Sequence, residues 1–197
     1  MVQDSFYKIA LKRFEELFMR ANDSTNREPA AVTLATADSD GRPSARIVLL
    51  RGFDERGFVF FTNSNSRKGQ ELTVNPQAAL CFYWDSLGEQ VRVEGSTETV
   101  DASESDNYWF QRPRESRLGA WASQQSERLK DRAAFESEIA SLATKYADQE
   151  IPRPPHWHGY RVVPRRIEFW QEGAHRLHTR TVFQNTALGW EKFFLYP

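Results

Sequence analysis

The spacing of apolar residues changes along the chain from a helical period to a strand period. Between residues 6 and 18, apolar side chains recur at steps of three and four, which predicts an amphipathic helix. From residue 30, apolar and polar residues alternate, which is typical of half-buried strands. Gly41 lies in the polar turn before the second strand and is the expected left-handed residue. The predicted strands are 31–37, 44–50, 58–62, 77–84, 89–99, 159–163, 167–171, 176–183 and 190–195.

Helical periods also occur between these strands. The predicted helices are 66–74, 101–111, 115–123 and 126–146. Many short strands joined by tight turns, with helices inserted among them, favour an antiparallel barrel over a doubly wound parallel sheet. We therefore predict a mainly β fold with peripheral helices, a β-barrel formed as one domain over residues 1–197 that includes the C-terminal strands at 159–197.

The charge balance argues against a nucleic-acid-binding protein. The 197 residues carry 27 acidic and 26 basic side chains, so a global basic field is absent. The single cysteine, Cys81, lies in an apolar run, so we expect a buried, inert thiol. One cysteine cannot form a disulfide within the chain, which fits a reducing compartment. No segment approaches the length that spans a bilayer, and the N-terminus lacks a signal pattern. We expect a cytoplasmic protein that binds neither membranes nor nucleic acid.

Two clusters of cationic residues are candidate anion sites. The sequence contains no glycine-rich phosphate loop, so cationic side chains would have to bind the phosphate of any nucleotide cofactor. Arg46 opens a strand, and Arg67 and Lys68 open a short helix whose dipole favours an anion. The second cluster comprises Tyr108, Arg112, Arg114 and Ser116. Each cluster also has a purely structural explanation. The first could be an ordinary charged helix start, and the second could be a polar junction between two helices.

A third stretch, residues 165–180, carries cationic or titratable groups at period two. Arg176, His178 and Arg180 would share one face of a predicted strand. That face is either a solvated edge or a binding face for an anion or an electron-rich ring. The turn before it contains Gly173, which can adopt a positive φ.

The remaining signals argue against chemistry by side chains alone. His156 and His158 lack a third nearby ligand, so no metal site is predicted. No carboxylate pair is placed for acid–base work, and no serine lies in a nucleophile elbow. Any catalysis would therefore belong to a bound cofactor.

Seven short motifs, in order along the chain, resemble the pyridoxamine 5′-phosphate oxidase family. They are RIVLL at 46–50, TNSNSRK at 62–68, QVRV at 90–93, RPRESRLGAW at 112–121, QS at 125–126, EFW at 168–170 and RLH at 176–178. The resemblance implies an FMN-binding split β-barrel that forms a homodimer, with one FMN in each of two clefts between the subunits.

The resemblance also implies roles for individual residues. Residues that would line the FMN site from one chain are Arg46, Ile47, Val48, Leu49, Phe61, Thr62, Arg67 and Lys68. Residues that would complete the FMN site are Gln90, Gln125, Ser126, Trp170 and Arg180. Residues that would bind the substrate phosphate are Tyr108, Arg112 and Ser116, and Arg51 is a further substrate residue. The pair that would face the substrate ring as catalytic residues is Arg176 and His178.

The implied reaction converts pyridoxamine or pyridoxine 5′-phosphate to pyridoxal 5′-phosphate, a reaction of vitamin B6 metabolism. Hydride would pass from the substrate C4′ carbon to flavin N5, and dioxygen would reoxidise the flavin to give hydrogen peroxide. FMN and the substrate each carry a phosphate, which requires two cationic clusters, and the sequence contains two. The alternatives are an FMN-dependent oxidase of another aromatic substrate, as in phenazine biosynthesis, and a split barrel that binds flavin without turnover.

Three features depart from the family pattern. Arg51 stands where the family usually has lysine, which keeps the charge but changes the hydrogen-bond geometry. Thr179 stands where the family usually has aspartate, and the lost carboxylate is expected to lower activity. Members usually begin with an extra segment that folds over the substrate, whereas this sequence begins at the first predicted helix.

Overall fold

The computed structural model describes residues 3–197. The helices are α1 (Gln3–Asn22), α2 (Arg67–Val74), α3 (Ala102–Gln111), α4 (Arg114–Ala122) and α5 (Arg132–Lys145), with short 3₁₀ turns η1 (Asp85–Leu87) and η2 (Ala174–Arg176). The strands are β1 (Ala31–Ala37), β2 (Pro43–Leu49), β3 (Gly52–Asp54), β4 (Gly57–Asn63), β5 (Gln77–Trp84), β6 (Glu89–Thr99), β7 (Trp157–Gln171), β8 (Thr179–Thr186) and β9 (Gly189–Leu195). The predictions for β1, β2, β4, β5, β6 and β9 agree within one residue at each end.

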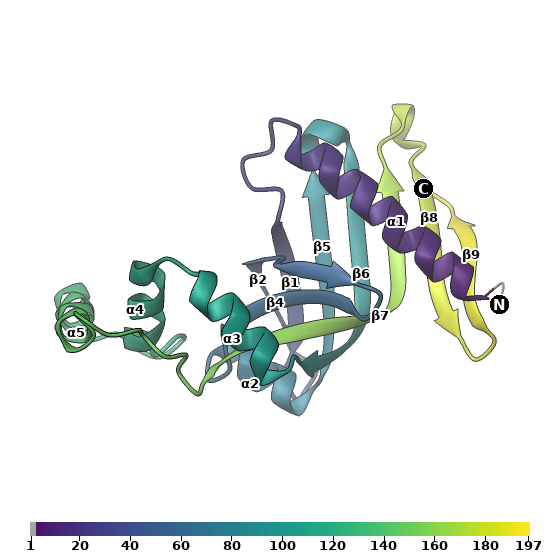
Figure 1. The fold of residues 1–197 in the computed structure, drawn as a ribbon. Coiled ribbons are helices and arrows are strands. Elements are labelled where there is room, and N and C mark those ends of the chain that lie inside the picture. Colours follow the sequence, from purple (N-terminus) through teal and green to yellow (C-terminus); the bar gives the residue numbers. More distant parts are fainter. Residues whose placement is uncertain (1–2) are drawn as a thin grey trace.

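The nine strands form one antiparallel sheet that curls into the predicted barrel-like shape (Figure 1). Its order is β2-β1-β5-β6-β7-β4-β3, and β8 and β9 continue from β7. The first half of β7 pairs with β4, its second half pairs with β8, and β6 runs along its other edge. The long strand β7 therefore joins the two parts of the sheet.

A bulge on β7 bends the sheet where this strand changes partner. Glu94 pairs with Arg166 and Gly95 with Pro164, so Arg165 is the extra residue on β7. A Cβ atom at Gly95 would lie 1.9 Å from the carbonyl oxygen of Val163. Pro164 lies at this bulge, where a residue without an N–H is tolerated. The prediction of two separate strands at 159–163 and 167–171 is therefore wrong, because one bent strand spans both segments.

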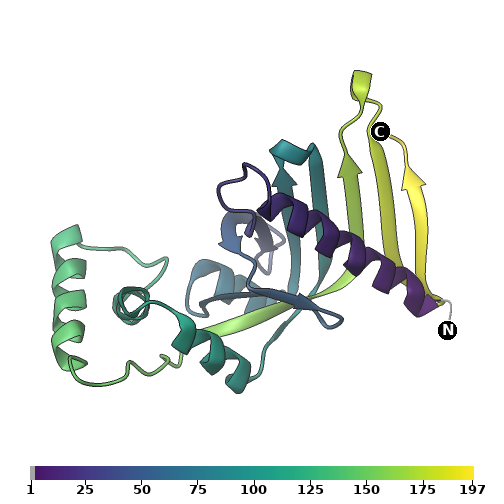
Figure 2. The same ribbon diagram turned by 45° about the horizontal axis from the view of Figure 1, so that its top comes forward.

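Helix α1 lies across one face of the curled sheet (Figures 1 and 2). Its apolar stripe is buried, and Phe14 contacts Phe58 and Phe82 with ring centroids 4.9 and 5.1 Å apart. Burial of one such side chain contributes about 2–3 kcal/mol to folding. The main hydrophobic core thus lies between α1 and the sheet, and the opposite face of β6–β8 is left without a helix.

Helices α3, α4 and α5 extend to the side of the sheet beyond β4 and β7 (Figure 2). A second apolar cluster, around Trp109 and Trp157, packs them together. The predicted helix at 126–146 begins later than expected, at Arg132, because Ser126 has a left-handed backbone (φ 79°). Asp131 then caps the helix by accepting a hydrogen bond from the Ala134 N–H at 2.7 Å. Residues 123–131 are consequently a loop beside α2.

Candidate functional site

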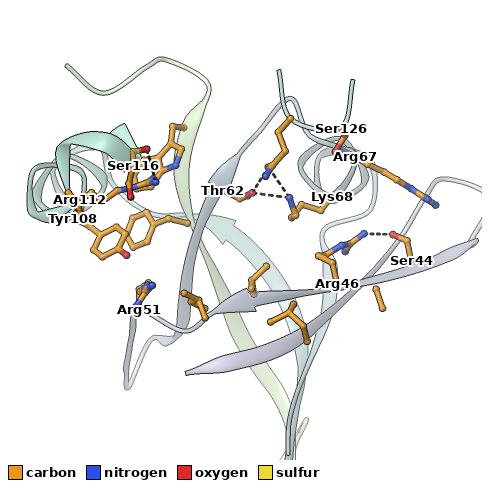
Figure 3. A pocket seen from close by; sticks show the side chains of 18 of the residues that line it. Ser44, Arg46, Arg51, Thr62, Arg67, Lys68, Tyr108, Arg112, Ser116 and Ser126 are labelled. Carbon is orange, nitrogen blue, oxygen red and sulfur yellow. Dashed lines mark hydrogen bonds between the residues drawn. The ribbon is translucent and has the colours of Figure 1, made fainter. Parts of the chain in front are cut away.

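A cavity of about 830 Å³ lies between strand β2, strand β4 and helices α2, α3 and α4 (Figure 3). Cationic side chains occupy two ends of this cavity. Arg46, Arg67 and Lys68 form one end, which we call the Lys68 end. Arg51, Tyr108, Arg112 and Ser116 form the other, which we call the Arg112 end. No Asp or Glu side chain lines the cavity in the described part of the chain.

Lys68 lies in the first turn of α2, where the hydroxyl-rich sequence caps the helix. Ser66 is the N-cap residue, and its hydroxyl also accepts a hydrogen bond from the Lys68 ammonium at 3.1 Å. The ammonium also donates to the Thr62 hydroxyl at 3.1 Å and to the Gln125 amide oxygen at 3.0 Å. Burial lowers the pKa of Lys68 to about 8, and the charge of Arg46 adds to this effect. Its three hydrogen-bond partners are neutral, so no carboxylate is paired with the ammonium among the described residues.

Two arginines complete the Lys68 end and share one carboxylate behind the cavity wall. Arg46 approaches Glu71 from β2 at 3.2 Å, and the Arg67 Nε donates to Glu71 at 2.8 Å. Burial alone would raise the pKa of Glu71, but hydrogen bonds from Ser44, Thr36, Arg67 and Arg46 outweigh it and lower the pKa to about 2. The backbone N–H of Arg67 donates to the Ser126 hydroxyl at 3.1 Å, which ties the 123–131 loop to α2.

The Arg112 end is built on a cluster of aromatic rings. The ring of Phe61 contacts those of Tyr108 and Trp157, with centroids 4.2 and 5.1 Å away, and the latter two rings lie 6.0 Å from each other. The Arg112 guanidinium lies 4.7 Å from the Trp157 ring centroid and donates to the Ser116 carbonyl oxygen at 3.2 Å. Burial lowers the pKa of Arg112, and nearby Arg51 lowers it further. The end thus offers two cations and two hydroxyls beside a flat aromatic wall.

The cavity brings together most of the predicted site residues. Those that line it are Arg46, Ile47, Val48, Leu49, Arg51, Phe61, Thr62, Arg67, Lys68, Tyr108, Arg112, Ser116, Gln125 and Ser126. Five predicted residues do not line it within this chain, namely Gln90, Trp170, Arg176, His178 and Arg180. These five lie at and near the β7–β8 connection, at the other end of the molecule from α3–α5 (Figure 1).

Three of these five residues form a row across the uncovered face of the sheet. Gln90 is opposite Trp170 on β6 and β7, and Trp170 is opposite Arg180 on β7 and β8. The Arg180 guanidinium nitrogens lie 2.8 and 2.7 Å from one oxygen of Glu168, a carboxylate that is almost fully buried. Glu168 also accepts from Arg166 at 3.2 Å. Strand pairing and the ion pair with Glu168 therefore hold this row in place without the cavity residues.

The connection between β7 and β8, residues 172–178, differs from the predicted strand. Strand β8 begins only at Thr179, so the prediction that Arg176, His178 and Arg180 share one strand face is wrong. His175 and Arg176 have left-handed backbones (φ 57° and 64°), whereas Gly173 is extended (φ −132°). The His178 ring lies 4.5 Å from that of Trp170, and its Nδ1 accepts from the Gly173 N–H at 3.2 Å. We call residues 170–180 the β7–β8 corner.

Sequence reasoning missed several residues of the site. Ser44, Gln111, Pro113 and Trp157 also line the cavity. Glu71 and Glu168, which form ion pairs with arginines, were given no role either, although Glu168 belongs to the EFW motif. A signal existed for Glu71, because it lies four residues after Arg67 on a helix, a spacing that favours an ion pair. No group of three or more His, Cys, Asp or Glu that could hold a metal ion occurs within residues 3–197.

The donors and walls of the cavity fit a flat, phosphate-bearing cofactor. The Lys68 end supplies three cations and hydroxyl donors for a phosphate. Ile47, Val48 and Leu49 supply an apolar strand edge between the two ends. FMN has both features, and a second phosphorylated molecule would find its cations at the Arg112 end.

Comparison with known families decides the identity of the chain. Residues 20–146 match the model of the family described as pyridoxamine 5′-phosphate oxidase. The chain belongs to the pyridoxamine 5′-phosphate oxidase family. Residues 157–197 match the pyridoxine 5′-phosphate oxidase C-terminal dimerisation region. The resemblance inferred from the seven motifs is thereby confirmed.

Relatives with the oxidase name cover nearly all of the chain. The pyridoxine/pyridoxamine 5′-phosphate oxidase of Sphingopyxis alaskensis is 52% identical, over 95% of this chain and 87% of its own length. The oxidase of the same name from Myxococcus xanthus is 54% identical, over 95% of this chain and 91% of its own length.

Solved structures agree with the fold. PhzG from Burkholderia lata, in complex with tetrahydrophenazine-1-carboxylic acid, superposes with a TM-score of 0.90 at 36% identity, over 95% of this chain and 92% of PhzG. An FMN-binding protein related to the family, from Nostoc punctiforme, has a TM-score of 0.73 at 20% identity, over 92% of this chain and 95% of its own length. The split-barrel prediction is confirmed. Within the described residues, no helix has the length and apolar character needed to cross a membrane.

Proposed function

We propose that this protein is an FMN-dependent oxidase that converts pyridoxamine 5′-phosphate or pyridoxine 5′-phosphate to pyridoxal 5′-phosphate, with dioxygen as the electron acceptor. One observation carries the proposal: a single cavity has cations at two ends and no carboxylate among its described lining residues. Such a cavity suits two phosphorylated molecules bound side by side. The oxidase names of relatives at 52–54% identity support the same substrates.

In this proposal the Lys68 end binds the FMN phosphate. The Lys68 ammonium and the Arg46 and Arg67 guanidinium groups would neutralise the dianion, and Ile47, Val48 and Leu49 would supply apolar contacts to the ring system. When bound, FMN would accept the hydride and pass the electrons to dioxygen, so that hydrogen peroxide forms. The side chains supply binding and orientation, which agrees with the absence of any carboxylate from the described lining of the cavity.

The Arg112 end binds the substrate phosphate. Arg51 and Arg112 supply charge, and the Tyr108 and Ser116 hydroxyls donate hydrogen bonds. Oxidation of the substrate would remove two electrons and two protons, which together with dioxygen account for hydrogen peroxide. Pyridoxine 5′-phosphate would give the aldehyde directly, whereas pyridoxamine 5′-phosphate would give an imine that water hydrolyses to the aldehyde with release of ammonia.

The β7–β8 corner of a second copy completes each site. Support comes from the dimerisation region at 157–197 and from the position of Gln90, Trp170 and Arg180 outside the cavity of their own chain. Arg176 and His178 of that copy would face the pyridine ring. Each dimer would then hold two equivalent sites at its interface, as isologous symmetry requires.

The test is anaerobic reduction of the bound flavin. Purified protein should be yellow, and pyridoxine or pyridoxamine 5′-phosphate should bleach the flavin absorbance without oxygen. Unphosphorylated pyridoxine should bleach it much more slowly, because the Arg112 end would lack its anion. Bleaching by tetrahydrophenazine-1-carboxylic acid but by neither pyridine phosphate would replace this proposal with a phenazine-type oxidase.

A further inference from the structure

Glu71 is a buried carboxylate that does not line the cavity but contacts residues that do. Its side chain is only 5% exposed, and it lies on α2 behind Ser44, Arg46 and Arg67. Among the ion pairs of residues 3–197, Glu71 is the only acidic partner of the cavity's cations. A buried charge of this kind is costly unless its hydrogen bonds are satisfied.

Every contact of the Glu71 carboxylate is with a donor. One oxygen accepts from the Thr36 hydroxyl, the Ser44 hydroxyl at 2.6 Å and the Arg46 guanidinium at 3.2 Å. The other oxygen accepts from Arg67 Nε at 2.8 Å. Strands β1 and β2 and helix α2 are therefore tied together at one carboxylate, and the two arginines are held at fixed positions on the cavity wall.

The net charge at this end is equal in size and opposite in sign to that of a phosphate dianion. Arg46, Arg67 and Lys68 carry three positive charges and Glu71 carries one negative charge. The remaining two positive charges match the two negative charges of a phosphate monoester. Without the carboxylate, two guanidinium groups and an ammonium would repel one another before any phosphate arrived.

We propose that Glu71 is the positioning residue of the Lys68 end, which holds Arg46 and Arg67 so that the site selects flavin with a phosphate over flavin without one. This inference rests on the proposed function, because it takes FMN as the ligand. Glu71 touches neither the ligand nor the reacting atoms, and it acts only through the two arginines.

The test compares FMN with riboflavin, which has the same ring system but no phosphate. The dissociation constants of both are measured by equilibrium dialysis of the full-length protein and of Glu71→Gln. A glutamine would turn an N–H₂ group toward at least one of the surrounding donors and so release Arg67 or Arg46. We expect the preference for FMN over riboflavin to fall about tenfold, the usual effect of losing one charged hydrogen bond.

Three other outcomes would each overturn the inference. A purely structural role would weaken both flavins equally and leave the preference unchanged. A purely electrostatic role would tighten FMN binding, because the end would gain positive charge. A preference that is unchanged with both affinities intact would show that the arginines need no carboxylate. Glu15→Gln, which removes an exposed carboxylate on α1, is the matched control and should change neither constant.

A second variant guards against a fold defect in Glu71→Gln. Thr36→Val removes the hydrogen bond that the Thr36 hydroxyl donates to Glu71 and the one that it accepts from Arg46, but it keeps both charges, and Thr36 does not line the cavity. It should lower the FMN preference by at least about threefold, because both lost contacts help to orient Arg46, and an unchanged preference would count against positioning. If the unaltered protein binds riboflavin as tightly as FMN, the assignment of the Lys68 end itself fails. If the unaltered protein prefers FMN and the Glu71→Gln variant shows the same preference, only the inference about Glu71 fails.

Discussion

The cavity beside α2 and the β7–β8 corner are both rich in cations, but their charges are used differently. At the Lys68 end, Arg46 and Arg67 share one carboxylate, that of Glu71, and Lys68 has only neutral partners. At the corner, two nitrogens of Arg180 already lie within 2.8 Å of Glu168. Three cations of the cavity, Arg51, Lys68 and Arg112, have no acidic partner among the described residues, whereas Arg180 is paired with Glu168, which Arg166 and Arg92 also approach. This difference fits the proposal that the cavity binds phosphate and that the corner contributes shape and orientation.

The two regions also differ in how completely one chain forms them. Residues from six helices and strands meet in the cavity, while the corner lies at the other end of the molecule (Figures 1 and 3). The backbone of the corner is strained at His175 and Arg176, and each left-handed residue of this kind costs on the order of 1 kcal/mol. Strain of this kind is typical of segments that present side chains to a ligand or partner. A second copy would bring such a corner to each cavity.

The largest expected effect comes from separating the two regions onto different chains. Lys68→Ala should empty the cavity of flavin, and Arg176→Ala should lower turnover about a hundredfold or more while flavin stays bound. In a mixed dimer of the two variants, one site carries both defects and the other carries neither. Co-expression should therefore restore activity to about a quarter of the unaltered level, since half of the dimers are mixed and each has one intact site.

The mixed-dimer experiment has an internal control. Co-expression of Lys68→Ala with Lys68→Met alters the same cavity residue in both chains and should restore nothing. Activity that stays at background in the Lys68→Ala and Arg176→Ala mixture, with mixed dimers verified by two affinity tags, would mean that each site is formed within one chain. The contrast between cavity and corner would then have no functional meaning.

The next largest effect is a pH dependence of FMN binding that arises from Lys68 in the cavity and not from the corner. The pKa of Lys68 is about 8, so the ammonium loses its proton as the pH rises through that value. A phosphate dianion binds the protonated form, and FMN affinity should fall about tenfold between pH 7 and pH 9. Fluorescence titration with FMN over this range measures the effect. Riboflavin affinity should stay flat, because riboflavin has no phosphate.

Lys68→Arg separates this effect from a general loss of structure at high pH. An arginine keeps its proton throughout the range, so the affinity of this variant for FMN should not fall between pH 7 and pH 9. An equal fall in the variant and the unaltered protein would assign the titration to another group. The same titration on Arg176→Ala should retain the fall, since the corner takes no part in phosphate binding.

The elements of the sheet could be predicted because each has a regular period. In strand β1, every second side chain (Val32, Leu34 and Thr36) is buried, and both predicted ends of this strand were correct. The cation clusters could also be predicted, because Arg67 with Lys68, and Arg112 with Ser116, are close in sequence. Their meeting in one cavity depends on pairings between distant strands, which side-chain alternation does not encode.

The errors lie where the backbone leaves its regular conformations. Period two between Arg176 and Arg180 predicted a strand, but left-handed residues at 175 and 176 interrupt it. Ser126 was likewise assigned to a helix that its positive φ excludes. Residues other than glycine rarely adopt a left-handed backbone, so the sequence offered little indication of it at Ser126, His175 and Arg176. The roles of Gln90, Trp170 and Arg180 rest on the family resemblance, and they stay predictions.

The smallest expected effect concerns Thr179, where the family usually has aspartate. Thr179 is exposed and lies next to Arg180 in β8, so successive side chains point to opposite faces of the sheet. An aspartate there could not replace Glu168 as the partner of Arg180, and an exposed charge pair contributes less than about 1 kcal/mol. We therefore expect Thr179→Asp to change kcat/KM by no more than about fivefold, with Thr179→Ser as the neutral control. A gain much larger than this would show that the corner, rather than the cavity, limits catalysis in this chain, and it would reverse the ranking of the two regions.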